Sequence, residues 1–390
     1  MNECFADLHI HIGSAKSGKP VKITASKSLT LSSILKAASE EKGMDMIGII
    51  DAHVPEVLEE LEQWLQSGRG RELDGGGIKV HQTTLILGSE LEVFDRNCSG
   101  PIHVLIYMPH YEAMVRFSKW IAQFMKNNTL SSQRVYVPGK VLQKKTKELG
   151  GLFIPAHIFT PFKSLYGRGV LRSLTEVFDP ELIDAVELGL SADTEMASSI
   201  KELDPYPFLA NSDAHSAGKI SREYQKFWLE EPAFDELVLA LNNLKGRKIL
   251  TTYGLNPLLG KYHQTVCEKC GAVIAGKSLQ CSECGSHRVI KGVSERLREL
   301  ADTENGVRGR PPYIHQVPLQ FIPGIGPITL QKLKERFGTE MDILHRVSRS
   351  DLETAVSGKV AGMIADARSG KLPVSSGGGG IYGKVQKDRT

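Results

Sequence analysis

The sequence lacks long hydrophobic runs and has few cysteines. No stretch reaches the roughly 18 apolar residues that a membrane-spanning helix needs, which excludes a span of that kind. The opening residues, MNECFADLHIH, lack the basic segment and apolar run of a secretory signal. Six cysteines in 390 residues are too few for a disulfide framework, and four of them stand in two Cys-x2-Cys pairs. We therefore expect a cytoplasmic protein without membrane contact, in which cysteines bind metal.

Charge is unevenly distributed along a chain whose length suits two or three domains. Residues 1–260 carry 28 Lys and Arg against 32 Asp and Glu, whereas residues 261–390 carry 20 against 13. A mildly acidic body joined to a basic C-terminal part is typical of an enzyme domain followed by a polyanion-binding module. Chance variation of surface charge explains the imbalance equally well.

Short apolar runs alternate with helical patterns over the first 255 residues. The seven runs are ECFADLHIH, MDMIGIIDAH, TTLILGSELEV, PIHVLIYMP, GGLFIPAH, LIDAVELGL and PFLANSDAH. Strands that alternate with helices predict an α/β fold with a mainly parallel sheet, and seven of them predict a barrel close to the (β/α)8 type. Between the runs, residues 67–77 and 127–139 are predicted to be mobile surface loops.

Side chains that can bind metal stand near the ends of these strands. His9 and His11 alternate with apolar residues and therefore point the same way. The corresponding residues of the later strands are Asp51, His53, Glu90, His103, His157, Glu187, Asp213 and His215. Strand ends of a parallel barrel converge on one mouth, where these donors would be too many for one tetrahedral ion. A single histidine at a strand end is usually structural, but recurrence on nearly every strand predicts two or three ions of Zn2+, Mn2+, Fe2+ or Mg2+.

The motifs DLHIH, IIDAH, GSELE, IHVLIY, PAH and NSDAH resemble those of the PHP (polymerase and histidinol phosphatase) phosphoesterases. This resemblance implies a distorted (β/α)7 barrel over residues 1–255. It implies a first ion on His9, His11, Glu90 and Asp213, a second on Glu90, His103 and His157, and a third on His53 and His215. Family members often carry another His or Asp after the first motif. This chain has GSAKSGKP there, so we expect Lys16 or Lys19 to contact phosphate.

Such a site predicts metal-assisted phosphoester hydrolysis. Ions about 3.5–4 Å apart can lower the pKa of a bridging water and stabilise an in-line displacement at phosphorus. Asp213, His11 and Glu90 are the expected catalytic residues. The sequence has no G-x-x-x-x-G-K-[ST] motif and so gives no support for nucleotide hydrolysis by a P-loop.

The paired cysteines predict a zinc-binding element over residues 262–290. The four ligands would be Cys267, Cys270, Cys281 and Cys284. Each pair can turn two thiolates towards one ion, and the short connection closes a tetrahedral S4 site. A redox Cys-x-x-Cys is the alternative, but two pairs so close together favour structural zinc. Cys4 and Cys98 stand alone and are expected to be buried thiols.

Residues 318–370 resemble a helix-hairpin-helix module, which grips the nucleic-acid backbone. In FIPGIGPITLQKLKERFG, Gly324 and Gly326 form the hairpin, and Lys332, Lys334 and Arg336 follow on the helix. Glycines before a helix start bring backbone N–H groups close to an anion. A second hairpin is expected within AVSGKVAGMIADARSG, and a simple helix-turn-helix packing unit is the alternative. Residues 291–317 would be a linker helix and Pro-rich connector, and residues 371–390 a disordered tail.

The order of these modules resembles the endonuclease Q family from Met1 to about residue 370. The resemblance implies a DNA repair endonuclease that uses metal-activated water to cut on the 5′ side of deaminated bases (uracil, hypoxanthine, xanthine) and of abasic sites. The damaged nucleotide would leave the stack for a pocket beside the metals. The candidate pocket residues are Phe159, Thr160, Phe162, Ser164 and Tyr166. Packing within the loop explains these aromatics equally well.

Two other functions fit the same sequence. A PHP-type 3′–5′ exonuclease or phosphatase acting on DNA ends would need the same metals and the same DNA-binding module. A non-catalytic DNA-binding scaffold is the second alternative, which the near-complete set of ligands argues against. In each case the expected partner is DNA, with replication or repair proteins as further candidates and the nucleoid as the expected location.

Overall fold

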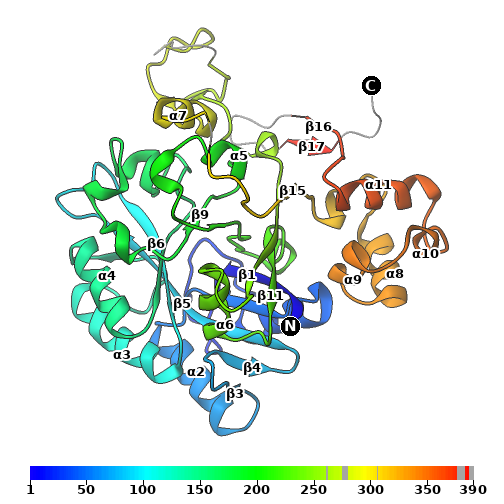
Figure 1. Ribbon diagram of the computed structural model, residues 1–390, viewed down its shortest axis with the longest axis horizontal. Helices are drawn as coiled ribbons and strands as arrows, with labels where there is room; N and C mark the ends of the chain where they lie inside the picture. The colour runs from blue at the N-terminus through cyan, green and yellow to red at the C-terminus, as the bar shows by residue number, and fades with distance from the viewer. Residues whose placement is uncertain (261, 275–279, 305, 376–382, 386–390) are drawn as a thin grey trace.

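The computed structural model describes residues 1–260, 262–274, 280–304, 306–375 and 383–385. A barrel is followed by a small cysteine-containing element and a separate group of helices (Figure 1). Within these described ranges, no helix combines the length and apolar character needed to cross a membrane.

All seven apolar runs form strands of the barrel. They are β1 (Asn2–Ile10), β2 (Met46–Ile49), β5 (Thr83–Val93), β6 (Ile102–Met108), β8 (Leu152–Pro155), β9 (Val186–Glu187) and β10 (Phe208–Leu209). Strands β1, β2 and β5 are parallel neighbours, and β9 is parallel to β10. Backbone hydrogen bonds of 3.1 Å from Ala214 to His9 and from His11 to Ala214 join the end of β10 to β1. The predicted α/β barrel is confirmed.

Strand β6 departs from the expected parallel arrangement. It runs antiparallel to both of its neighbours, β5 and β8. The start of β6 therefore lies beside the end of β8, and the Ala156 N–H donates to the carbonyl of His103 at 3.0 Å. The prediction of a mainly parallel barrel is wrong for this strand. Because β6 is reversed, His103, near the beginning of this strand, lies at the mouth of the barrel.

Further strands extend the sheet beyond the barrel. Beside β1, β11 (Tyr224–Leu229) and β12 (Lys248–Gly254) run antiparallel to each other, and β15 (Tyr313–His315) is parallel to β12. The Pro-rich connector thus contributes a strand. The short strands β3 (Arg71–Glu72), β4 (Ile78–Val80) and β7 (Arg134–Val135) lie on the β5 side.

Helices surround the barrel, and the longer ones are amphipathic. The helices are α1 (Leu31–Lys36), continued by a π-helical turn η1 (Ala37–Lys42), α2 (Pro55–Gln66), α3 (Tyr111–Ile121), α4 (Gly139–Glu148), α5 (Thr194–Ala197) and α6 (Phe234–Leu241). In α2, Pro55 occupies the first turn, where a missing N–H costs nothing, and Val57, Leu61 and Trp64 form one buried face. The amphipathic pattern therefore determines which face packs against the sheet.

The C-terminal third contains two small units and the end of the chain. The cysteine element has β13 (Val266–Cys267) and β14 (Val289–Ile290), followed by α7 (Val293–Leu300). The helical domain consists of α8 (Pro327–Phe337), α9 (Glu340–His345), α10 (Arg349–Glu353) and α11 (Gly358–Arg368). In the supposedly disordered tail, β16 (Val374–Ser375) pairs with β17 (Lys384–Val385), which corrects that prediction for these residues. Residues 376–382 and 386–390 of the tail lie outside the described residues.

A buried ion pair joins the helical domain to the barrel. Nζ of Lys42 lies 2.9 Å from both carboxylate oxygens of Glu340, and both side chains are at most 5% exposed. Beside it, the His345 ring stacks on Phe5 at 4.7 Å between centroids. Because a buried charge needs its partner, this pair favours a single docked orientation of the domain.

Replacing Lys42 with Ala is expected to lower the free energy of unfolding by roughly 3–5 kcal/mol, because Glu340 would stay buried without a counter-charge. Thermal or urea denaturation followed by circular dichroism measures this loss. The control, Lys334→Ala, removes a more exposed pair with Glu41 and should cost less than about 1 kcal/mol. Equal small losses in both variants would contradict this role for the buried pair.

Candidate active site

Two fully buried histidines, His9 in β1 and His11 directly after this strand, form the floor of the site. Nδ1 of His9 lies 3.0 Å from Oε1 of Glu187, and Nδ1 of His11 lies 3.2 Å from Oδ2 of Asp51. A carboxylate that accepts the Nδ1 proton sets the tautomer and leaves the Nε2 lone pair available to a metal. Asp51 and Glu187 therefore orient the histidines instead of joining the ligand groups.

The Nε2 atoms of His9, His11 and His103 are buried and have no hydrogen-bond partner among the described residues. Nε2 of His9 lies 3.4 Å from Oδ1 of Asp213 and 3.6 Å from Oε1 of Glu90. These distances are long for hydrogen bonds, but two donors on one tetrahedral ion lie roughly 3.4 Å apart when each bond is about 2.1 Å. The orphaned nitrogens and this spacing both fit a divalent cation.

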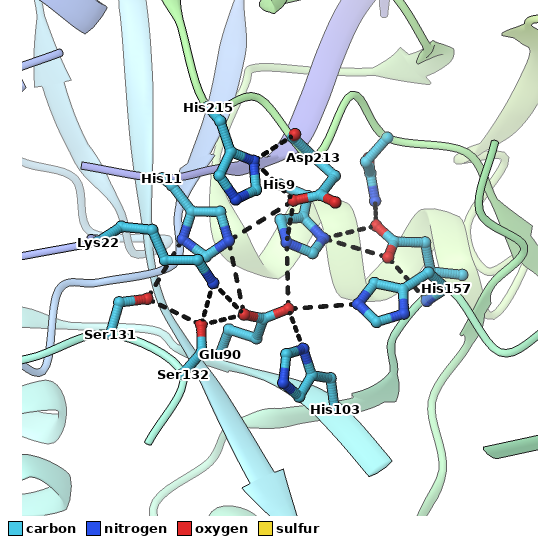
Figure 2. A network of polar contacts seen from close by, with 12 residues as sticks. His9, His11, Lys22, Glu90, His103, Ser131, Ser132, His157, Asp213 and His215 are labelled. Carbon is cyan, nitrogen blue, oxygen red and sulfur yellow. Dashed lines mark hydrogen bonds and ion pairs between the residues drawn. The ribbon is translucent and has the colours of Figure 1, made fainter. Parts of the chain in front are cut away.

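Glu90 stands at the centre of the cluster (Figure 2). Its Oε1 lies 2.8 Å from Nδ1 of His103 and 3.4 Å from Nε2 of His157. Its Oε2 lies 3.5 Å from Nε2 of His11. Because the two oxygens face different histidines, this carboxylate can bridge two ions, as the family resemblance implies.

Three groups of donor atoms each gather within 4.8 Å. They are His9, His11 and Glu90; Glu90, His103 and His157; and His11, Asp213 and His215. Seven of the eight expected metal ligands lie in these groups, and His53 does not. His53 is fully buried, and neither of its ring nitrogens has a hydrogen-bond partner in the part of the chain that the structure describes. Burial lowers its pKa to about 4. The expected pairing of His53 with His215 is therefore corrected, since His11 and Asp213 stand beside His215 instead.

The charge of the site favours a cation. Burial lowers the pKa of His9, but Glu187 and Asp213 outweigh burial and raise it to about 10. Burial raises the pKa of Asp213, yet His9 and His215 hold it below its ordinary value. A buried pocket that retains a proton so strongly has an excess of negative charge, which a divalent ion would neutralise.

Backbone conformation also places ligands at the mouth. His157 and Asp213 adopt left-handed conformations with φ of 31° and 44°. The backbone N–H groups of Ser212 and Ser221 donate to Asp7 at 3.1 and 2.8 Å, which clamps both ends of the segment that carries Asp213. Left-handed residues of this kind are costly and occur where the surroundings impose them, often at functional sites.

Three polar residues of the site were missed by the sequence prediction. Nζ of Lys22 lies 3.0 Å from Oε2 of Glu90 and also contacts Ser132, which contacts the same carboxylate. The Ser131 hydroxyl lies 3.2 Å from Nδ1 of His11. Ser131 and Ser132 are buried, which corrects the interpretation of 127–139 as a mobile surface loop. No local sequence signal distinguishes these residues from other loop residues.

Lys16 and Lys19, the lysines expected to contact phosphate, lie elsewhere. Both are exposed, and Lys19 pairs with Glu56. The lysine that reaches the site is instead Lys22, later in the same segment. The exposure of Lys16 and Lys19 and the pairing of Lys19 with Glu56 give no support to the expected phosphate contact of these two residues.

A cavity of about 500 Å³ opens beside the ligand groups. Thr160, Phe162 and Lys163 line one wall, together with Tyr262, whose ring meets that of Phe162 edge-on at 5.7 Å. Its volume is within the range of small-molecule sites. The other cationic lining residues are Lys22, Lys219 and Arg222.

Only part of the expected base pocket faces this cavity. Thr160 and Phe162 line it, whereas Phe159, Ser164 and Tyr166 do not. Phe159 and Tyr166 are at most 1% exposed and stack on each other at 5.5 Å. Ser164 accepts a hydrogen bond from the Gly167 N–H at 3.0 Å. These three residues pack within the loop and do not line the cavity beside the donor groups, which corrects their assignment to a base pocket there.

The four predicted zinc ligands come together. The Sγ atoms of Cys267 and Cys284 are 3.6 Å apart, as are those of Cys270 and Cys281. Thiolates at about 2.3 Å from one zinc ion would be roughly 3.8 Å apart, so the four thiols fit a tetrahedral ion. The backbone N–H of Cys270 lowers the pKa of the Cys267 thiol to about 6, which favours the thiolate.

The helical domain brings its two hairpins together. Gly324 has φ 93°, and a Cβ there would lie 2.9 Å from Cγ2 of Val360 in α11. Gly326 precedes the N-terminus of α8, and Lys332 is exposed on that helix. The two other expected DNA-binding side chains have intramolecular partners: Lys334 binds Glu41, and Arg336 donates to the carbonyl of Thr354.

Known proteins share this architecture. Protein YqxK of Bacillus subtilis, described as uncharacterized, is 58% identical over 386 residues, which is 99% of this chain and all of that protein. The crystal structure of the lesion-specific endonuclease PfuEndoQ from Pyrococcus furiosus matches with a TM-score of 0.86 and 31% identity, over 99% of this chain and 95% of that one. The chain belongs to the endonuclease Q family. No protein-family model matches the sequence.

A second endonuclease Q structure contains a 27-mer duplex substrate with an abasic lesion at the active site. It has a TM-score of 0.84 and 30% identity and covers 99% of this chain and 96% of its own. Membership of the endonuclease Q family, which the sequence resemblance predicted, is confirmed. Together with the three donor groups, it makes this chain a metal-dependent phosphodiester hydrolase.

Replacing Asp51 with Asn is expected to weaken divalent-metal affinity about 10- to 100-fold, because His11 would lose the carboxylate that orients its ring. Calorimetric titration of metal-free protein with Mn2+ or Zn2+ measures this effect. The matched control is Asp184→Asn, which alters a carboxylate that binds Lys147 and the Phe153 N–H instead of a ligand histidine. Equal affinities for Asp51→Asn and the wild type would refute this orienting role.

Proposed function

We propose that this chain is a lesion-specific DNA repair endonuclease. It hydrolyses the phosphodiester on the 5′ side of deaminated bases (uracil, hypoxanthine, xanthine) and of abasic sites. The observation that carries the proposal is the match over nearly the whole chain to the lesion-specific endonuclease PfuEndoQ, combined with a cavity beside three metal-donor groups. The endonuclease Q complex with an abasic duplex supports damaged DNA as the substrate.

The cavity suits a nucleotide that has left the helix. The residues that line it include the donor residues Glu90, His103 and His157 and the aromatic residues Phe162 and Tyr262. An extruded nucleotide can therefore place its phosphate towards the metal donors while its base or sugar contacts the aromatic wall. A damaged nucleotide costs less free energy to extrude than an intact paired one. Contacts with this wall would then distinguish the damaged nucleotide once it has entered the cavity.

Each group of side chains has a separate task in hydrolysis. Divalent ions bound by the histidines and carboxylates would supply Lewis-acid activation of water and neutralise phosphate charge. Asp51 and Glu187 hold the Nδ1 protons of His11 and His9, so the opposite nitrogens stay aimed at the centre. Lys22, beside Glu90, supplies a positive charge that can bind a phosphate oxygen.

The helical domain would grip the DNA backbone. The hairpins before α8 and α11 lie against each other through Gly324 and Val360, so the N–H groups at the two helix starts can contact neighbouring phosphates. Contacts of this kind carry no sequence information and weaken with salt. We also propose that the Cys4 element binds a structural Zn2+, with no open position for chemistry.

The decisive experiment is cleavage of a 5′-labelled duplex with one internal uracil, beside an undamaged duplex, in Mn2+, Mg2+ or Zn2+. We expect a single product that ends immediately 5′ of the uracil, because the lesion is the nucleotide most easily extruded. Denaturing gel electrophoresis at single-nucleotide resolution locates the cut. A ladder that shortens from the 3′ end equally on both duplexes would instead identify an exonuclease.

A covalently closed circle with one uracil provides the matched control. An endonuclease converts this circle to the nicked form, whereas an enzyme that needs a free terminus leaves it intact. An intact circle after complete digestion of the linear duplex would therefore overturn the proposed endonuclease.

Replacing Asp213 with Asn is expected to abolish cleavage while DNA affinity changes little, because the amide removes a metal-donor charge but no DNA-binding surface. Gel assays give the cleavage rate, and fluorescence anisotropy with a labelled duplex gives the affinity. Asp235→Asn, an exposed change in α6, serves as the control and should cleave like the wild type. Parallel loss of affinity and cleavage in Asp213→Asn would contradict the catalytic assignment.

A further inference from the structure

One part of the acidic barrel is entirely basic. Between residues 113 and 147 the sequence has eight Lys and Arg and no Asp or Glu, although residues 1–260 as a whole carry more acidic than basic side chains. The segment includes most of α3, the turn η2 (Ala122–Phe124), β7 and most of α4. In Figure 1 these helices lie on the opposite side of the barrel from the helical domain.

Cations and aromatic rings are paired on this surface. The pairs are Arg134 over Phe94 at 4.6 Å, Lys126 over Tyr136 at 5.6 Å and Lys145 over Trp120 at 5.9 Å from the ring centroid. Hydrogen bonds connect the parts of this surface, because the Tyr136 N–H donates to the Phe124 carbonyl at 2.8 Å and the Gly139 N–H donates to Oδ2 of Asp95 at 2.9 Å.

Two of the rings remain open to solvent. Tyr136 is 55% exposed and Phe94 is 40% exposed, whereas Val135 and Val137 on the alternate positions are buried. This alternation directs Tyr136, the residue after β7, outward while its two neighbours are packed in the core. Exposed aromatics beside several cations are the combination with which proteins bind single-stranded nucleic acid.

This surface reaches the mouth of the active site. Glu92 accepts from Nε of Arg134 at 2.7 Å and lies 3.1 Å from Nζ of Lys163, which lines the cavity. Ser131 and Ser132, in the same basic segment, lie within the metal-donor cluster. A DNA strand that leaves the cavity past Lys163 would therefore meet Arg134 next.

We propose that this basic aromatic surface, formed by Phe94, Lys126, Arg134, Tyr136, Lys140 and Lys144, binds a single-stranded stretch of DNA that flanks the scissile bond. The cations neutralise phosphates, and the rings of Phe94 and Tyr136 stack on bases that have lost their partners. The proposal rests on DNA being the substrate. It adds a contact on the barrel itself that would stabilise the opened strand while the lesion occupies the cavity.

The test is fluorescence anisotropy of a labelled oligothymidylate with the full-length wild type and its variants over a series of salt concentrations. Tyr136→Ala should weaken binding about tenfold or more through the lost stacking. The double variant Lys140→Ala/Lys144→Ala should reduce the slope of log affinity against log salt by about 1.4, the effect of two lost phosphate contacts. The matched control, Lys36→Ala/Lys248→Ala, removes two exposed lysines elsewhere on the barrel and should bind like the wild type.

A second readout uses the unmodified protein. Acetylation of lysines followed by mass spectrometry should show protection of Lys126, Lys140 and Lys144 by the oligothymidylate, with Lys36 and Lys248 unprotected. Unchanged affinity and salt slope in both variants, or no protection of these lysines, would overturn the proposal. Failure to cleave the uracil duplex would refute the proposed lesion specificity. The binding and protection measurements do not depend on cleavage and would still test the surface.

Discussion

The carboxylate of Glu90 is the interaction on which the site depends. Its two oxygens, nearly inaccessible to solvent, face His103 and His157 on one side and His11 and Lys22 on the other. A buried carboxylate is costly unless positive charge or hydrogen-bond donors surround it. Lys22 and His103 therefore hold the pKa of Glu90 well below its ordinary value in spite of burial. The same need for positive charge around Glu90 favours the binding of cations in this pocket.

Bringing these donors together requires departures from a regular barrel. Strand β6 runs antiparallel to its neighbours, so His103 reaches the mouth from the beginning of a strand. His157 and Asp213 reach it from left-handed positions beyond the ends of theirs. Behind this first layer, Asp51 and Glu187 orient the ring nitrogens that do not face the centre. The irregular elements and the orienting carboxylates thus together position the metal-donor side chains at the mouth of the barrel.

The other parts of the chain surround this centre with surfaces suited to a polyanion. The helical domain contacts the barrel through the buried pair of Lys42 and Glu340, which favours one docked orientation of its hairpins. Helices α3 and α4, which belong to the basic segment, lie on the other side of the barrel (Figure 1). Lys163, which lies 3.1 Å from Glu92, connects this region to the cavity that it lines. Such an arrangement would hold DNA on both sides of the cut, which suits an enzyme that acts within a strand instead of at its end.

The sequence by itself determined the seven strands, the residue types at their ends and the four cysteines, because each depends on local periodicity or spacing. Only the tertiary structure decided which side chains enter the site. Lys22 meets Glu90 and Ser132 across 68 and 110 residues of sequence, whereas His53, at a strand end, lies outside the donor groups. Phe159 and Tyr166 turn inward to stack on each other, and Phe162 between them faces the cavity. Loop residues have no periodicity that predicts direction, so their positions follow from packing between distant segments.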